Sequence, residues 1–131
     1  MEDCLKTHMS DEVTILLAED NPENITTMSD YLSFKGYRVL LALNGLEALE
    51  KVQSDHPNLI LMDIQMPQMD GLEAIRHIRQ NSSLDSIPIV ALTALAMSGD
   101  RERCLAAGAN EYLSKPVRLR VLAETIEGLL T

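Results

Sequence analysis

The stretch that decides the fold is Leu59-Ile60-Leu61-Met62-Asp63-Ile64-Gln65-Met66-Pro67-Gln68-Met69-Asp70-Gly71. Four apolar residues lead without a break into Asp63, and a short loop with Pro67 follows before Asp70-Gly71 opens a helical pattern. An unbroken apolar run between turn residues is typical of a strand buried on both faces, as in a parallel sheet. The pattern therefore places Asp63 at the carboxyl end of a central strand, where functional groups gather in open α/β sheets.

Four further apolar or β-rich segments surround this strand, and a helical pattern follows each of them. We expect these strands at residues 13–18, 37–42, 87–92 and 111–113. Five β-then-α repeats predict an α/β fold in which helices cover both faces of a parallel sheet. Right-handed crossovers leave few topologies, and the flavodoxin-like order 2-1-3-4-5 is the one expected for five strands.

Helix boundaries follow from capping residues. Asn21 before Pro22 predicts the start of the first helix, and Asp70 predicts the start of the third. Asn44 with Glu47 three residues later resembles a capping box at the start of the second helix.

Glycines and leucines give the remaining helix limits. Gly36 is expected to close the first helix in a left-handed conformation, and Gly108 to end a short fourth helix over residues 99–107. The spacing of Leu46, Leu49 and Val52 predicts the buried face of the second helix.

Composition narrows the function. The 131 residues suffice for one domain, which we place at residues 12–131, and 46% of them are hydrophobic. A net charge of −9 and the absence of Trp argue against nucleic acid as a partner. No apolar run is long enough to span a bilayer. Residues 1–11 are polar, and we expect them to form either a flexible leader or, around His8-Met9, a cloning remnant. Cys4 and Cys104 lack metal-ligand spacing, so reduced thiols in a cytoplasmic protein are expected.

Distinctive side chains stand at four strand ends. They are Glu19 and Asp20 after the first strand, Asp63 after the third, Thr93 after the fourth and Lys115 after the fifth. Because parallel strands end at one edge of the sheet, we expect these groups to converge. Three neighbouring carboxylates repel one another unless a cation joins them, and hard oxygen ligands favour Mg²⁺. A carboxylate is also a nucleophile toward phosphorus, so the edge is suited to phosphoryl transfer.

The ordered set Glu19-Asp20, Asp63 with Met66-Pro67 and Asp70-Gly71, Thr93-Ala94 and Lys115-Pro116 resembles the receiver domain of two-component response regulators. The resemblance spans about Val13 to Leu130. It implies that Asp63 accepts a phosphoryl group from a histidine kinase or a histidine phosphotransfer protein. It also implies that Mg²⁺ is held by Glu19, Asp20, Asp63 and the main-chain carbonyl of Gln65.

The same resemblance assigns the remaining roles. Thr93, Ala94 and Lys115 would bind phosphoryl oxygens, Tyr112 with Thr93 would form a switch, and the bond before Pro116 would be cis. The output would be the surface of the fourth helix, fifth strand and fifth helix. Asn24 and the segment from Ala91 to Met97 look most like receiver domains of hybrid sensor kinases. The chain would then be a signalling domain that assists its own phosphorylation and dephosphorylation rather than an enzyme. The sequence does not decide whether the domain forms a weak homodimer.

Three other functions, and a purely structural role for each polar residue, fit the sequence less well than a receiver domain. Taken singly, each polar residue is more simply a cap, a turn residue or a surface charge. An aspartyl-nucleophile phosphatase of the haloacid-dehalogenase type would carry a second Asp where this chain has Gln65. A flavin or nucleotide binder would need a glycine-rich loop, and the stretch from Asn21 to Asn24 is glycine-free. A receiver-like module that no longer accepts phosphate would lack Asp63, Thr93 or Lys115, and all three are present.

Overall fold

The computed structural model describes residues 13–66, 69–94 and 99–130, so the expected leader, Pro67 and Leu95–Met97 lie outside the described residues. Five strands alternate with five helices in the described ranges. The strands are β1 (Thr14–Ala18), β2 (Arg38–Ala42), β3 (Leu59–Asp63), β4 (Ile89–Thr93) and β5 (Glu111–Ser114). The helices are α2 (Pro22–Phe34), α3 (Gly45–Asp55), α4 (Gly71–Gln80), α5 (Asp100–Ala107) and α6 (Leu119–Leu130).

The sheet has the expected topology. All four strand pairs are parallel, and the order is β2-β1-β3-β4-β5. Asp63 pairs with Leu92, and Thr93 pairs with Ser114, so the last residues of β3, β4 and β5 reach the same edge. The register thus brings together strand ends that are distant in sequence.

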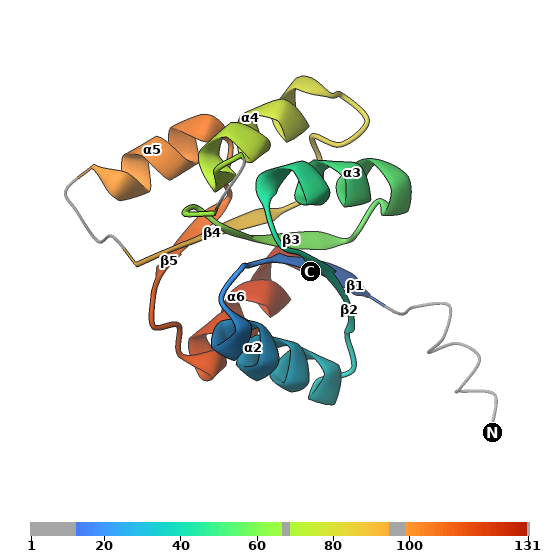
Figure 1. The fold of residues 1–131 in the computed structure, drawn as a ribbon, viewed down its shortest axis with the longest axis vertical. Coiled ribbons are helices and arrows are strands. Elements are labelled where there is room, and N and C mark those ends of the chain that lie inside the picture. The colour runs from blue at the N-terminus through green and yellow to red at the C-terminus, as the bar shows by residue number, and fades with distance from the viewer. Residues whose placement is uncertain (1–12, 67–68, 95–98, 131) are drawn as a thin grey trace.

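Helices cover both faces of the sheet, with α3, α4 and α5 on one side and α2 and α6 on the other (Figure 1). The two hydrophobic clusters differ in the size of their side chains. The cluster under α3, α4 and α5 is rich in alanine, with Ala18, Ala42, Ala48, Ala74, Ala91, Ala107 and Ala109. The cluster under α2 and α6 is built from long aliphatic side chains such as Ile15, Leu17, Leu32, Leu61, Leu122 and Ile126. None of the helices in the described ranges has the length and apolar character needed to cross a membrane.

The capping residues act as the sequence predicts. The side chain of Asn21 accepts hydrogen bonds from the first turn of α2, and Asn44 and Asp70 do the same for α3 and α4. One detail of the expected capping box differs, because the Glu47 carboxylate accepts a hydrogen bond from the Leu43 N–H at 2.9 Å. In a standard box it would bond to the cap residue itself.

The predicted buried face of α3 is wrong at Leu46, whose side chain is 45% exposed. The buried stripe consists of Gly45, Ala48 and Val52. The Gly45 N–H donates to the Met69 carbonyl at 3.1 Å, and a Cβ at Gly45 would collide with Met69. This close backbone contact turns the glycine inward and leaves the neighbouring leucine outside.

Arg79 of α4 fastens the loops at the amino edge of the sheet. Its guanidinium donates to the Gly108 carbonyl at 2.9 Å, the Asp85 carbonyl at 2.9 Å and Asn110 Oδ1 at 2.8 Å. Asn110 Oδ1 also accepts a hydrogen bond from the Ile89 N–H at 2.9 Å. One side chain therefore joins α4 to the segments that precede β4 and β5.

Candidate functional site

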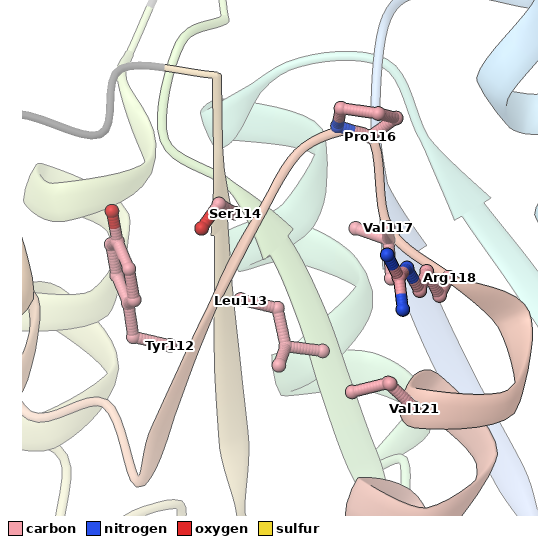
Figure 2. Close-up of a pocket in the computed structure, with 7 residues that line it drawn as sticks. All are labelled: Tyr112, Leu113, Ser114, Pro116, Val117, Arg118 and Val121. Carbon is pink, nitrogen blue, oxygen red and sulfur yellow. The ribbon is translucent and has the colours of Figure 1, made fainter.

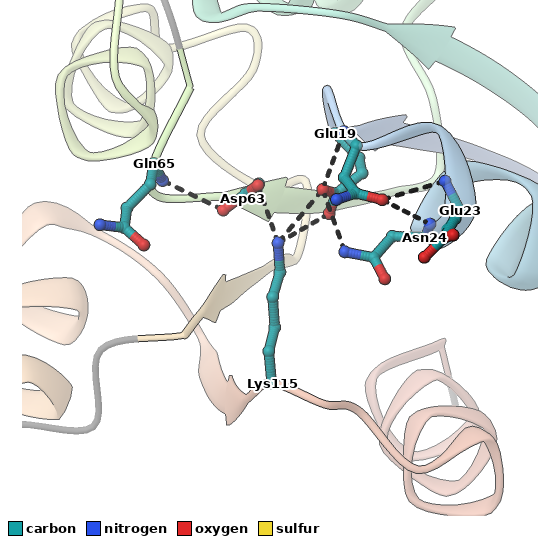
Figure 3. Close-up of polar contacts among 7 residues, drawn as sticks. Glu19, Glu23, Asn24, Asp63, Gln65 and Lys115 are labelled. Carbon is teal, nitrogen blue, oxygen red and sulfur yellow. Dashed lines mark hydrogen bonds and ion pairs between the residues drawn. The ribbon is translucent and has the colours of Figure 1, made fainter.

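Asp63 lies at the centre of the carboxyl edge of the sheet, and the residue is 2% exposed. Its Oδ1 accepts a hydrogen bond from the Gln65 N–H at 3.0 Å, and its Oδ2 accepts one from Lys115 Nζ at 2.8 Å (Figure 3). The loop after β3 and the end of β5 therefore hold the carboxylate from two directions.

Glu19 follows β1 and is fully buried. Its Oε2 accepts hydrogen bonds from the Asn21 N–H at 3.3 Å, Asn24 Nδ2 at 3.4 Å and Lys115 Nζ at 3.2 Å. Its Oε1 lies 3.0 Å from Lys115 Nζ as an ion pair but forms no aligned hydrogen bond within the described residues. A buried carboxylate oxygen thus keeps capacity for a further ligand.

Glu19, Asp20 and Asp63 each offer a carboxylate oxygen, and these oxygens all lie within 4.8 Å of one another. Asp20 is exposed, whereas the other two residues are buried. Such a set of hard oxygen donors, open to solvent on one side, is suited to Mg²⁺, which retains several waters when bound to proteins. The unsatisfied Glu19 Oε1 supports the same fit.

Lys115 follows β5 and extends its ammonium between Asp63 and Glu19 (Figure 3). Its main-chain N–H donates to the Thr93 carbonyl at 2.8 Å, and its side chain is 17% exposed. The bond from Lys115 to Pro116 is cis. The strand end and the bend after it place a positive charge among the carboxylates.

Asp63 and Lys115 shift each other's pKa. Burial raises the pKa of Asp63 to about 6, although the hydrogen bonds from Lys115 and Gln65 act in the opposite direction. Burial alone would lower the pKa of Lys115, but its contacts with Asp63 and Glu19 outweigh this, so its pKa is raised. Lys115 thus remains an ammonium at neutral pH.

Thr93 and Ala94 lie along the same edge, whereas Tyr112 lies within β5. Thr93 is buried at the end of β4, and Ala94 follows it in an exposed position. Tyr112 is partly buried against the alanine-rich cluster, whereas Leu113 belongs to the cluster under α2 and α6. Figure 2 shows these two side chains on opposite sides of β5. Tyr112 therefore borders the side of the sheet on which α5 lies.

Sequence patterns did not reveal two contributors to the site. Asn24 donates to Glu19 across the strand–loop–helix junction, where no periodic spacing applies. Gly71 lies so close to β3 that a Cβ would collide with the Asp63 carbonyl. Asp70-Gly71 was recognisable as a helix start, but the backbone contact depends on how α4 packs.

A doubly wound parallel sheet, with three carboxylates and one lysine at its carboxyl edge, defines the CheY-like class of flavodoxin-like folds. The chain belongs to the response regulator receiver domain family, whose model matches residues 15–127. It is accordingly a receiver domain of two-component signalling, and its acidic cluster is consistent with a magnesium-binding phosphoacceptor site.

Relatives and solved structures agree with this family. The chain is 39% identical over 117 residues to the polar-differentiation response regulator DivK of Brucella ovis, a match that covers 89% of this chain and 95% of the relative. It is 41% identical to the receiver domain of the sensor histidine kinase PA1611 from Pseudomonas aeruginosa, with a TM-score of 0.85, covering 91% of this chain and 98% of the other. That crystal structure has a magnesium ion in the active-site cleft. CheY4 of Vibrio cholerae is 30% identical with a TM-score of 0.85, covering 91% of this chain and 99% of the other.

Proposed function

We propose that residues 12–131 form a receiver domain in which Asp63 accepts a phosphoryl group from a phosphohistidine donor. The observation that carries this proposal is the contact of the buried Asp63 carboxylate with Lys115 at 2.8 Å, beside Glu19 and Asp20. A carboxylate oxygen of Asp63 attacks phosphorus, the O–P bond forms as the P–N bond breaks, and the donor imidazole leaves with the electron pair. Two residues after Asp63 the chain has Gln65 rather than a second carboxylate, which suits a phosphoacceptor domain rather than an enzyme that turns over a substrate.

The charged groups of the edge have distinct tasks in this proposal. Lys115, released from Asp63 Oδ2, binds a phosphoryl oxygen, and the Thr93 hydroxyl and the Ala94 N–H bind others. Glu19, Asp20, Asp63 and the main-chain carbonyl of Gln65 are the groups that would hold Mg²⁺. When bound, Mg²⁺ supplies positive charge that offsets the repulsion between the carboxylates and the incoming phosphoryl group.

The donor is a histidine kinase or a histidine phosphotransfer protein. A pocket of about 170 Å³ borders the site, lined by Asn24, Thr27, Met28, Lys115, Pro116, Val117 and Leu119. It lies between α2 and the loop that leads into α6, beside the lysine that contacts Asp63. A partner that presents its histidine over Asp63 would cover this pocket, and a cytoplasmic location follows from such a donor. The proposed parent protein is a hybrid kinase. Weak homodimer formation by this domain is a separate proposal.

The proposed output is the surface of α5, β5 and α6. A pocket of about 360 Å³ lies on it, lined by Tyr112, Leu113, Ser114, Pro116, Val117, Arg118 and Val121 (Figure 2). In the phosphorylated state the Thr93 hydroxyl moves toward the phosphoryl group, and the Tyr112 ring turns into the space that its loop vacates. The phosphoryl group must favour the second packing energetically for this population shift to occur.

Intact mass spectrometry tests the phosphoacceptor. The full chain, incubated with acetyl phosphate and Mg²⁺, is expected to gain one phosphoryl group, and omission of Mg²⁺ is expected to suppress the gain. Asp63→Asn should gain none, whereas Asp30→Asn, a change at an exposed residue of α2, should behave as the unmodified chain does. An undiminished adduct in Asp63→Asn would contradict the assignment.

A second measurement separates the switch from the phosphoacceptor. Beryllofluoride, a phosphoryl mimic, is expected to shift the NMR signals of Tyr112 and α5 in the unmodified chain. Thr93→Ala should still be phosphorylated at Asp63 but show smaller shifts at Tyr112 and α5. Shifts confined to the loops around Asp63 would refute the switch and leave the phosphoacceptor intact.

A further inference from the structure

The free edge of β2 is a surface that phosphoryl chemistry does not use. In the described part of the chain β2 pairs with β1 alone and ends the sheet. The Arg38 N–H donates to the Val13 carbonyl at 2.8 Å, and the Ala42 carbonyl accepts from the Glu19 N–H at 3.0 Å. Because the backbone groups of a strand alternate in direction, those of Val39 and Leu41 point away from β1, toward the open edge.

Beyond Arg38, this edge lacks the usual protection. Natural edge strands are blunted by charged residues, proline or bulges, because an open row of N–H and C=O groups invites another strand. The five residues from Val39 to Leu43 read VLLAL, without a charge or a proline. Leu41 is 36% exposed and Leu43 is 45% exposed. Outward backbone groups and exposed apolar side chains thus occur together on one short strand.

The surrounding charge indicates which kind of strand would bind. Residues 13–70 contain nine Asp and Glu and three Lys and Arg, a net charge of −6, whereas residues 71–130 contain seven of each and are neutral. Glu47 lies in the first turn of α3, directly after the loop that follows the carboxyl end of β2. The Glu47 side chain reaches the edge itself, where it accepts from the Leu43 N–H. Arg38 stands at the opposite end of the strand.

We propose that the free edge of β2 binds an extended segment of a partner protein by strand addition, with basic residues of that segment beside Glu47. Main-chain hydrogen bonds to Val39 and Leu41 provide the affinity, as in other strand-addition complexes. The exposed leucines contact apolar side chains of the partner, and Glu47 together with the net negative charge of residues 13–70 selects for positive charge. A second copy of this chain is disfavoured, because each copy brings the same negative charge to the edge.

Peptide binding to the full chain tests this proposal by NMR. The probe is a short blocked peptide of alternating valine and threonine that ends in three lysines, made with the lysines at either terminus because an edge accepts both directions. Binding of at least one form is expected to protect the Val39 and Leu41 amides from solvent exchange. Leu40, whose backbone groups already face β1, serves as an internal reference. A matched peptide with N-methylated valines keeps the charge but cannot donate the strand hydrogen bonds, and it should not protect these amides.

Two matched variants complete the test, because Leu41 and Leu105 are both 36% exposed but lie on β2 and α5. Leu41→Lys is expected to weaken peptide binding by about tenfold or more, since it loses an apolar contact and adds a like charge. Leu105→Lys should bind the peptide with an affinity within about twofold of that of the unmodified chain. Both variants should have the same melting temperature as the unmodified chain. Equal binding by Leu41→Lys, or binding without protection of Val39 and Leu41, would overturn the proposal. Concentration-dependent protection of these amides without peptide would also overturn it, in favour of a second copy.

Discussion

Replacing Lys115 by glutamine removes the positive charge that lies between Asp63 and Glu19. The ammonium nitrogen is 2.8 Å from Asp63 Oδ2 and 3.0 Å from Glu19 Oε1, and both carboxylates are buried. In metal-free protein the variant would therefore hold two neighbouring buried carboxylates without their counter-ion. We expect a marked loss of stability at pH 8.

The size of this loss follows from the geometry. At an effective dielectric constant of about 20, each ion pair at such a distance has a Coulomb attraction of roughly 6 kcal/mol. Dehydration of the ammonium cancels much of this attraction, and removal of one partner from a buried pair usually costs about 3–5 kcal/mol. Because the Lys115 side chain is 17% exposed, we expect the lower end, about 3 kcal/mol. For a domain of this size the melting temperature would fall by roughly 10 °C.

The pKa of Asp63 determines how the stability loss of Lys115→Gln changes with pH. The pKa of Asp63 is about 6 in the native state and 3.8 as its ordinary value, so the native protein binds more protons between these values. The contribution of this carboxyl to stability is complete below about pH 4 and is lost as the pH rises through its native pKa. Without Lys115 this pKa rises further, because a favourable charge is gone. The variant should therefore lose less stability, relative to the unmodified protein, at pH 5 than at pH 8, where both carboxylates have lost their counter-ion.

Urea unfolding in EDTA at pH 5 and pH 8 measures both quantities. Lys35→Gln, at an exposed position after α2, is the matched control and should change stability by less than about 0.5 kcal/mol. Added Mg²⁺ should stabilise Lys115→Gln more than the unmodified chain, because it would meet uncompensated carboxylates. If Lys115→Gln proves as stable as the unmodified chain at pH 8 without metal, the electrostatic argument is refuted.

Four further substitutions test the acidic cluster and the packing around the sheet. Asp20→Asn should leave the stability of the metal-free protein unchanged or slightly raised, because repulsion between the carboxylates falls. In thermal melts, Mg²⁺ at tenfold its Kd should stabilise the unmodified chain by about 1.4 kcal/mol, and Asp20→Asn should lose most of this stabilisation. Gly71→Ala should lose about 2–3 kcal/mol in urea unfolding, because the added Cβ collides with the Asp63 backbone. Gly128→Ala, whose Cβ meets open space within α6, should instead gain about 0.5–1 kcal/mol, and equal effects of the two glycine changes would contradict the packing argument. Arg79→Ala should lose about 1–2 kcal/mol, because the Gly108 and Asp85 carbonyls lose their donor, while its Mg²⁺ affinity stays unchanged; a weaker affinity would show that the amino edge of the sheet reaches the site.

The sheet and the acidic edge were predictable because their signals are local. The apolar run that ends in Asp63 identifies a buried strand by itself, and right-handed crossovers then bring the end of β1 and the end of β5 to the same side. The convergence of Glu19, Asp63 and Lys115 needs no further information than the order of the strands.

The sequence-based predictions were wrong or incomplete where tertiary packing determines the position of a side chain. The spacing of Leu46 fits a buried helix face, but the rotation of α3 is fixed by the contact of Gly45 with Met69, which no helical period contains. The hydrogen bond from Asn24 to Glu19 depends on the angle at which α2 leaves β1.

The alanine-rich face of the sheet has a consequence for dynamics. Of the five helices in the described ranges, α5 is the shortest, and its buried residues are Asp100, Cys104 and Ala107. On the opposite face α6 buries Leu122 and Ile126, which remove far more apolar surface from water. Helix α5 can therefore separate from the sheet by local unfolding at a lower free energy than α6. Its amides should exchange with solvent well before those of α6, so the helix that the proposed switch must move is the one that the core restrains least.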